Sequence, residues 1–335
     1  MMTEAEQFIQ ILCKHSSFKT TPATNAFVDR TWRHWEQSNI TRPAEALEIQ
    51  ENLTHIVDGY YKELLKAAKL QENSPILFYG SIASLQAYAK SFPDKSRVIV
   101  IDSKLDSFLI EFITACVFCA CTNPNDADLA KYKSLFELLI LRLHHQETPA
   151  ATRHTFEFYE NLVKSDYDLA LIGAVYSSAI MSFILAHELA HHILGHTESF
   201  SFSEKPTTAT VTQDIVLSHE EEYQADELAT QLMGQLIQDK ENWLGGDRKA
   251  LSVLPLIFNI LHYAKQHTSN SEVESLTHPS PENRKRRIND TLSSFDFSSQ
   301  ELQINDAIEE VLVFFSSGIS PTDQRLRKKS GEILL

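Results

Sequence analysis

Apolar positions along this chain of 335 residues recur mainly every three or four residues, the spacing of a helix with one buried face. The longest apolar run, Leu169–Ala186, contains no charged residue, so it predicts a helix that is buried on all sides. A second strong pattern begins near Ser218 and continues through a row of leucines. The other predicted helices cover Ala5–His15, Asn25–Gln37, Pro43–Lys69, Asp106–Cys121, Asp126–His145, Thr152–Lys164, Arg248–Gln266, Arg284–Leu292 and Gln300–Phe315.

Two short segments depart from this helical spacing. Ile76–Tyr79 and Arg97–Ile101 are rich in β-branched and aromatic residues and predict strands. Between them we expect a helix over Ser81–Ser91, ended by Pro93. The pattern therefore predicts a mostly helical α+β protein with a small sheet that includes Val98–Ile101, and the edge of such a sheet can bind an extended peptide.

Composition narrows the class of protein. The formal net charge is −15, and the basic residues form only short clusters at 284–287 and 325–329, so we do not expect binding to nucleic acid through phosphates. The first residues are acidic and lack the apolar segment of a secretory signal. The chain has four cysteines, Cys13, Cys116, Cys119 and Cys121, and no second cluster that would complete a zinc site. Cysteines that are few and unpaired are typical of a protein in a reducing cytoplasm.

The long apolar run ends in the pentapeptide HELAH, which has the pattern H-E-x-x-H. Residues four apart on a helix are offset by about 40°, so His187 and His191 project from one face as two imidazole ligands. Glu188 lies about 100° around the helix from His187, where it can reach a metal-bound water. Zinc hydrolases need this geometry together with a third protein ligand. The alternative is an ordinary buried helix with two histidines, but such a cluster is costly unless it is paired or binds metal.

Three residues are candidates for the third ligand. On a continuing helix His196 would point about 140° away from the second histidine, so it could join the site only if the helix ended first. Glu198 stands where metzincin sites have their last ligand. Those sites need a helix-breaking glycine at the position of Leu194, and here Gly195 comes one residue later. That leaves an acidic residue of the segment Ser218–Ala229, which is predicted to form a second helix.

Glu222 and Asp226 lie four residues apart and share a helix face, with Ala225 leaving room beside them. A glutamate there can complete a tetrahedral site, and an aspartate one turn on can accept the free N–H of a ligand histidine. A solvated helix start has the same composition, because acidic residues favour helix N-termini. The residues alone leave both interpretations open.

The motifs HELAHHILGH and E-Y-Q-A-D resemble the glutamate-zincin peptidases typified by the heat-shock protease HtpX and the CAAX prenyl proteases. The segment Thr277–Arg284, THPSPENR, is similar to the T-H-P-x-x-x-x-R element that those peptidases carry downstream. The resemblance covers the chain from Leu169 to Ile288, and three motifs in the right order are more specific than H-E-x-x-H alone. HELAHHILGH followed by E-Y-Q-A-D-E-L-A also resembles the soluble ImmA/IrrE metallopeptidases of bacterial stress and phage regulation.

The resemblance implies zinc as the cofactor and Glu222 as the third ligand, with Asp226 orienting a ligand histidine. It also points to His278, in a loop stiffened by two prolines, as a hydrogen-bond donor to the oxyanion; the alternative is that His278 caps the following helix. Two features depart from the family pattern. His219 stands where the family usually has arginine, and the chain has no convincing membrane span although members often have them.

We therefore expect a zincin-like metallopeptidase core over residues 73–320, an N-terminal helical extension over 1–72 and a mobile tail over 321–335. The expected reaction is zinc-dependent hydrolysis of peptide bonds in one or a few cytosolic proteins. Glu188 would take a proton from water and pass it to the leaving amine. A non-proteolytic zinc-binding scaffold is the alternative, and the intact Glu188 argues against it because the ligands alone would suffice for structure.

Overall fold

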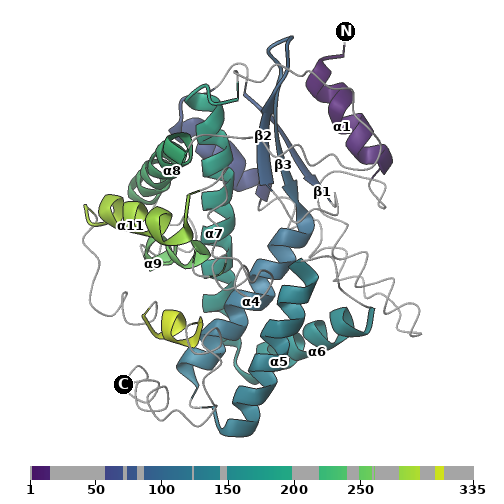
Figure 1. Ribbon diagram of the computed structural model, residues 1–335, viewed down its shortest axis with the longest axis vertical. Helices are drawn as coiled ribbons and strands as arrows, with labels where there is room; N and C mark the ends of the chain where they lie inside the picture. The colour runs from purple at the N-terminus through teal and green to yellow at the C-terminus, as the bar shows by residue number, and fades with distance from the viewer. Residues whose placement is uncertain are drawn as a thin grey trace.

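The computed structural model describes residues 2–15, 57–70, 74–80, 87–122, 124–143, 149–197, 219–239, 249–258, 260, 279–294 and 306–312. This part of the chain is mostly helical with one small sheet (Figure 1), which confirms the expected α+β class. The predicted helix over Asn25–Gln37, His278 and the tail lie outside the described residues. The domain boundary at residue 72 stays a prediction.

The sheet has three strands, β1 (Ile76–Gly80), β2 (Ala87–Ser91) and β3 (Arg97–Asp102), in the order β1-β3-β2. β3 is parallel to β1 and antiparallel to β2. Both predicted strands are confirmed, but the helix expected over Ser81–Ser91 is wrong from residue 87 onward. A tight turn over residues 92–96 folds β2 back onto β3, and this pairing prevails over the helix propensity of the alanines and lysine in β2.

The two faces of the sheet pack against different helices. Helix α1 (Glu4–His15) covers one face, where Ala5 and Leu12 pack on Val98 and Val100. The β2–β3 turn also caps this helix, because the Glu4 N–H donates to Asp94 Oδ2 at 2.8 Å. Ile99 and Ile101 point the other way, into the main core. β3 is thus buried on both faces, as its unbroken apolar run requires.

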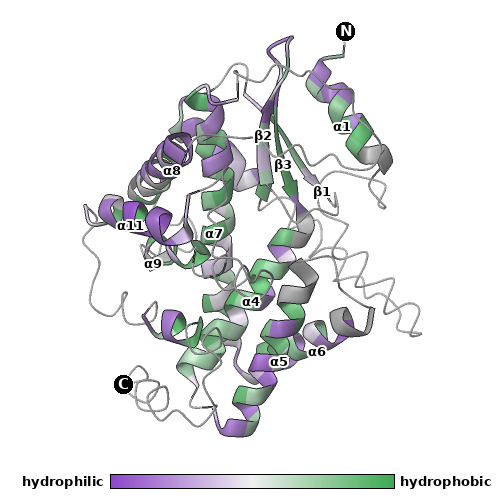
Figure 2. Cartoon of the chain, viewed as in Figure 1, coloured by the Kyte–Doolittle hydropathy of each residue, from purple (hydrophilic) through white to green (hydrophobic). Residues whose placement is uncertain are grey.

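The main core is built around the pair α4 (Ser103–Cys121) and α7 (Tyr167–Ile193), with α5 (Asp126–Leu143) and α6 (Pro149–Ser165) beside them. Figure 2 shows both α4 and α7 apolar over most of their length. They cross closely at Gly173, where an added Cβ would lie 2.5 Å from Thr114 Oγ1. Cys116, Cys119 and Cys121 are buried in α4, and burial raises the pKa of each thiol, so these cysteines serve packing.

Asp166 is the N-cap of helix α7, and its side chain accepts a hydrogen bond from the backbone N–H of Leu169. Among the described residues α7 is the one helix long and apolar enough to span a membrane, and 61% of its most apolar stretch is buried inside the fold. Helices α8 (His219–Asp239), α9 (Lys249–Ser252) and α11 (Pro281–Leu292) lie on the side of α7 away from the sheet (Figure 1). The helix predicted over Arg248–Gln266 is wrong as one element, because a turn that contains Pro255 interrupts it.

Candidate metal centre

The last turns of α7 carry the H-E-x-x-H residues, and α8 crosses beside them. The Nε2 atoms of His187 and His191 are 3.0 Å apart. Glu222 of α8 brings Oε2 to 3.6 Å from His187 Nε2 and Oε1 to 3.8 Å from His191 Nε2. One ligand atom from each of the three residues lies within 4.8 Å of the other two, and all three residues are buried. The structure thus brings the three predicted ligands together.

Two residues behind the ligands hold them in position. Asp226 is fully buried, and its Oδ1 lies 2.9 Å from Nδ1 of His187, as predicted for an aspartate that orients a ligand histidine. The guanidinium of Arg284 on α11 donates two hydrogen bonds of 2.7 Å to the carboxylate of Asp226, and its Nη1 lies 3.1 Å from Glu222 Oε2. Sequence reasoning gave Arg284 no role, although it ends the T-H-P-x-x-x-x-R segment. Both of its partners are on α8, and Asp226 lies 58 residues before Arg284 in the chain.

The ionisable groups of the centre divide into charged and neutral forms. Burial disfavours a charged imidazole, yet the hydrogen bond and charge of Asp226 outweigh it and raise the pKa of His187. Burial and the neighbouring His187 lower the pKa of His191 to about 2. Burial also opposes ionisation of Asp226, but Arg284 outweighs it and lowers the pKa of that carboxyl. These contacts are satisfied when His187 carries both ring protons and donates from Nε2 to His191 Nε2.

The proton on Nε2 of His187 lies between the two nitrogen atoms that would both bind a metal ion. The centre brings together three acidic side chains, Glu188, Glu222 and Asp226, and Arg284 offsets only one of them, so acidic groups are in excess and a divalent cation would offset them. Two imidazole nitrogens and one carboxylate oxygen are also the donor set typical of catalytic zinc. The residues present therefore fit zinc.

Glu188 lies beside the ligands and faces β2. It is buried, and it accepts a hydrogen bond from the backbone of Ala89. Burial first, and the charge of Glu222 further, raise the pKa of Glu188 to about 7 despite the opposing charge of His187. Within the described residues β2 has a strand neighbour on one side only. The carboxylate expected to act as the base thus lies between the candidate ligands and the open edge of the sheet.

Helix α7 ends before His196, so this side chain does not point away from the site as it would on a continuing helix. The helix ends at Ile193, and Gly195 adopts a φ of 77°, so the chain turns back in a Schellman motif. The His196 N–H donates to the His191 carbonyl at 3.0 Å, and the Gly195 N–H donates to the His192 carbonyl at 3.4 Å. His196 then lies with Nδ1 3.0 Å from Nδ1 of His191. It therefore contacts the ring nitrogen of His191 that faces away from the other ligands. Glu198 lies outside the described residues.

His192 fixes the ligand-bearing helix to the sheet. Its Nε2 lies 3.0 Å from the carbonyl oxygen of Val98 in the central strand, and its Nδ1 lies 3.1 Å from Thr197 Oγ1. The Thr197 hydroxyl in turn lies 2.7 Å from Ser91 Oγ at the end of β2. The sequence signalled this only as a histidine directly after HELAH. These contacts hold the edge strand at a fixed distance from Glu188 and the ligands.

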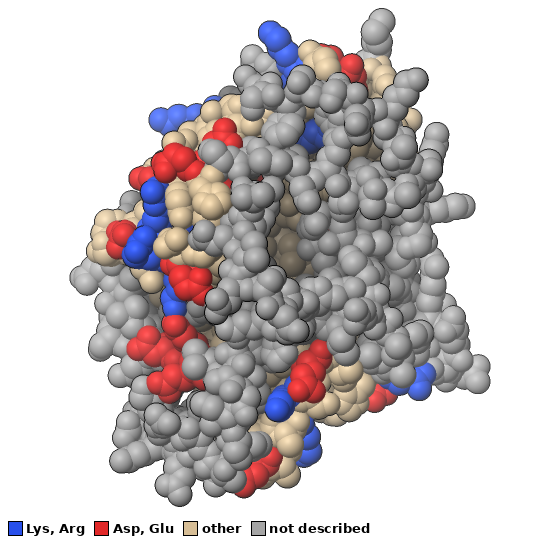
Figure 3. All heavy atoms as spheres, in the orientation of Figure 1, with Lys and Arg blue, Asp and Glu red and all other residues tan. Residues whose placement is uncertain are grey.

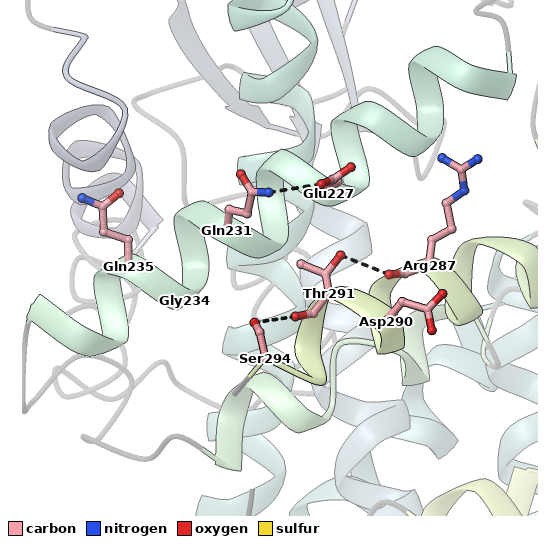
Figure 4. Close-up of a pocket in the computed structure, with 8 residues that line it drawn as sticks. All are labelled: Glu227, Gln231, Gly234, Gln235, Arg287, Asp290, Thr291 and Ser294. Carbon is pink, nitrogen blue, oxygen red and sulfur yellow. Dashed lines mark hydrogen bonds between the residues drawn. The ribbon is translucent and has the colours of Figure 1, made fainter. Parts of the chain in front are cut away.

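A separate surface groove lies between α8 and α11 (Figure 4), with a volume of about 620 Å³. It is lined by Glu227, Gln231, Gly234, Gln235, Arg287, Asp290, Thr291 and Ser294. None of these residues belongs to the candidate metal centre, and Glu227, Gln231 and Gln235 of α8 are exposed. On the surface in Figure 3, acidic and basic side chains are interspersed over this region. The groove is therefore a polar outer surface of the helices whose inner sides build the centre.

Comparison with known proteins gives one match. The sequence model of the family described as Peptidase U49 matches residues 118–309, which include all the residues of the candidate metal centre from α7, α8 and α11. No curated protein and no solved structure matches the chain. The resemblance to HtpX, the CAAX proteases and the ImmA/IrrE peptidases stays a prediction.

Proposed function

This chain belongs to the peptidase U49 family, and on that premise we propose that it is a zinc-dependent endopeptidase. One observation carries the proposal. His187, His191 and Glu222 converge from two helices at ligand distance, and Glu188 lies next to them with a pKa of about 7. A structural zinc site would need only the ligands. A buried carboxylate with a pKa close to neutral is what a general base requires.

In the proposed reaction His187, His191 and Glu222 would hold zinc, and Asp226 accepts the Nδ1–H of His187, which leaves Nε2 of that ring as the nitrogen that would bind the metal. Zinc, when bound, supplies Lewis acidity that polarises the scissile carbonyl and activates water. Glu188 accepts the proton of the attacking water on its carboxylate and then donates it to the leaving amine. His278 is proposed as a further donor to the oxyanion, and its position lies outside the described residues.

We propose that the substrate is a protein segment bound in extended form along β2. The support is geometric, because the backbone of Ala89 contacts Glu188, so a chain lying on this edge would run past the base. A cytoplasmic location and a small number of targets are also part of the proposal. They rest on the few cysteines and on the substrate segment having to fit between a fixed strand edge and a buried base.

The test is to express the wild-type chain and Glu188→Gln in the native host and to compare protein fragments in the two proteomes. Glutamine keeps the size of the side chain but cannot accept the proton, so turnover should fall by about 10²–10⁴-fold while zinc content stays near one per chain. Glu227→Gln, an exposed change on α8, is the matched control and should cut like wild type.

Two outcomes would contradict the proposal. Wild-type protein that takes up no zinc on reconstitution would remove the proposed cofactor. If both proteins hold zinc and the fragments are the same in the two strains, the chain is a zinc-binding scaffold and not a peptidase.

A further inference from the structure

We propose that His196 is a positioning residue that sets which ring nitrogen of His191 is free to bind metal. The feature that points to it is a double connection between the two residues. The His196 backbone N–H donates to the His191 carbonyl at 3.0 Å, and the two Nδ1 atoms are also 3.0 Å apart. His196 is buried, and its ring stands edge-on to the His191 ring at an angle of 62°. The Schellman turn at Gly195 creates this arrangement.

The contact between His196 and Gln224 determines which atom donates in each of these hydrogen bonds. His196 Nε2 lies 3.2 Å from Oε1 of Gln224, a carbonyl oxygen that can only accept. The proton of a neutral His196 is therefore on Nε2, which leaves Nδ1 as an acceptor. His191 must then carry its proton on Nδ1 to donate to His196. Its Nε2, the atom 3.0 Å from Nε2 of His187, is then an acceptor whose lone pair is directed at the metal position.

The two ligand histidines are thus oriented by different partners. Asp226 accepts from His187, and the pair His196–Gln224 accepts from His191. Without His196, the Nδ1–H of His191 would be buried with its partner removed, and the ring could take the other tautomer, which presents an N–H to the ion. Loss of such an outer partner weakens metal binding by about 10–100-fold. Gln224 belongs to α8, so the same contacts tie the ligand turn of α7 to the helix that carries Glu222.

This inference rests on the zinc site proposed above, and its test includes a measurement that needs no metal. In the metal-free full-length chain labelled with ¹⁵N-histidine, nitrogen chemical shifts distinguish the two neutral tautomers. We expect His191 of the wild type as the Nδ1–H form. The spectra are recorded at a pH above the pKa of His187, where that ring no longer donates to Nε2 of His191. There His196→Ala should convert His191 to a mixture, and His196→Asn should keep the wild-type form because Oδ1 of asparagine can accept in place of Nδ1.

The second measurement is zinc affinity by competition with a chromophoric chelator. His196→Ala should bind zinc about 10–100-fold more weakly than wild type, and His196→Asn should recover most of this loss. His154→Ala removes an exposed histidine on α6 and should leave the affinity unchanged. If the alanine variant folds and keeps both the tautomer and the affinity, the positioning role is refuted. If it does not fold, a folded asparagine variant that loses both properties refutes it.

The two hypotheses fail in different ways. A wild type that binds no zinc, with His191 still in the Nδ1–H form, would end the proposed function and leave the orienting contact in place. A wild type that binds zinc with His191 in the other tautomer would end the positioning role alone.

Discussion

The guanidinium of Arg284 forms two parallel contacts of 2.7 Å with the carboxylate of Asp226, from Nε and from Nη2. The side chain of Asp226 is fully buried, and that of Arg284 is 13% exposed. A third guanidinium nitrogen lies 3.1 Å from Glu222 Oε2. Asp226 and Glu222 are therefore neutralised together by one cation from α11. A helix outside the ligand-bearing pair thus determines where two of the acidic groups of the centre lie.

Arg284→Ala should lower the free energy of unfolding of the metal-free protein by about 3–5 kcal/mol, because it leaves two buried carboxylates without their cation. Chemical denaturation measures this loss. Arg287→Ala, one turn further along α11, is the matched control. Its side chain is 44% exposed, 3.5 Å from Glu220 and over the ring of Tyr223, so the loss should be about 0.5–1.5 kcal/mol. Equal losses in the two variants would contradict the bridging role.

Glu222→Ala should weaken zinc binding by far more than Glu227→Ala, since Glu222 alone of the two lies within ligand distance of the histidines. Losing one of three protein ligands costs more than losing an outer partner, so we expect a change above about 100-fold. Elemental analysis after dialysis against a weak chelator gives the comparison. Zinc retained by Glu222→Ala and lost by Glu198→Ala would identify a metzincin-like site.

The apparent zinc affinity of Glu188→Gln should rise with pH. The pKa of His187 is raised above its ordinary value, so below that pKa zinc must displace the proton on its Nε2. The second raised group, Glu188, is absent from this variant. Binding should therefore weaken about tenfold for each pH unit below the pKa of His187. Competition with a chromophoric chelator over a pH series measures the affinity, and an affinity that does not change between about pH 5 and 6.5 would contradict the assignment.

Gly173→Ala should destabilise the protein although alanine favours helices. The added Cβ would lie 2.5 Å from Thr114 Oγ1 and 2.7 Å from its Cα, and the backbone atom cannot rotate away. We expect a loss of about 1–3 kcal/mol in the free energy of unfolding. Gly59→Ala is the control, since a Cβ there meets nothing within 4 Å. That change should stabilise by about 0.5–1 kcal/mol, and a loss of equal size at Gly59 would contradict the explanation.

Features that depend on local spacing could be predicted from the sequence. His187, His191, Glu222 and Asp226 were predicted from helical spacing and from motif order, and in the structure the first three converge while the fourth accepts from His187. Their grouping depends on two long helices, one with an unbroken apolar run and one with a row of leucines, and long elements of this kind can be predicted from the sequence.

Features that depend on contacts between distant segments were missed. β2 was predicted as helix because its small residues have no strand preference of their own, and only pairing with β3 makes it a strand. Arg284 received no role because no local rule links it to Asp226. The position of His196 could have been found, since a glycine two residues after the last helical residue signals a Schellman turn.

The order of the centre along the chain also sets a schedule for its assembly during translation. Arg284 lies 97 residues after His187, which at typical rates of synthesis corresponds to roughly 5–20 s. Helix α8 is made within that interval, and its carboxylates Glu222 and Asp226 then lack the cation that neutralises them. The candidate metal centre is thus completed late, and a nascent chain carries these acidic groups without their counterion while it is still being synthesised.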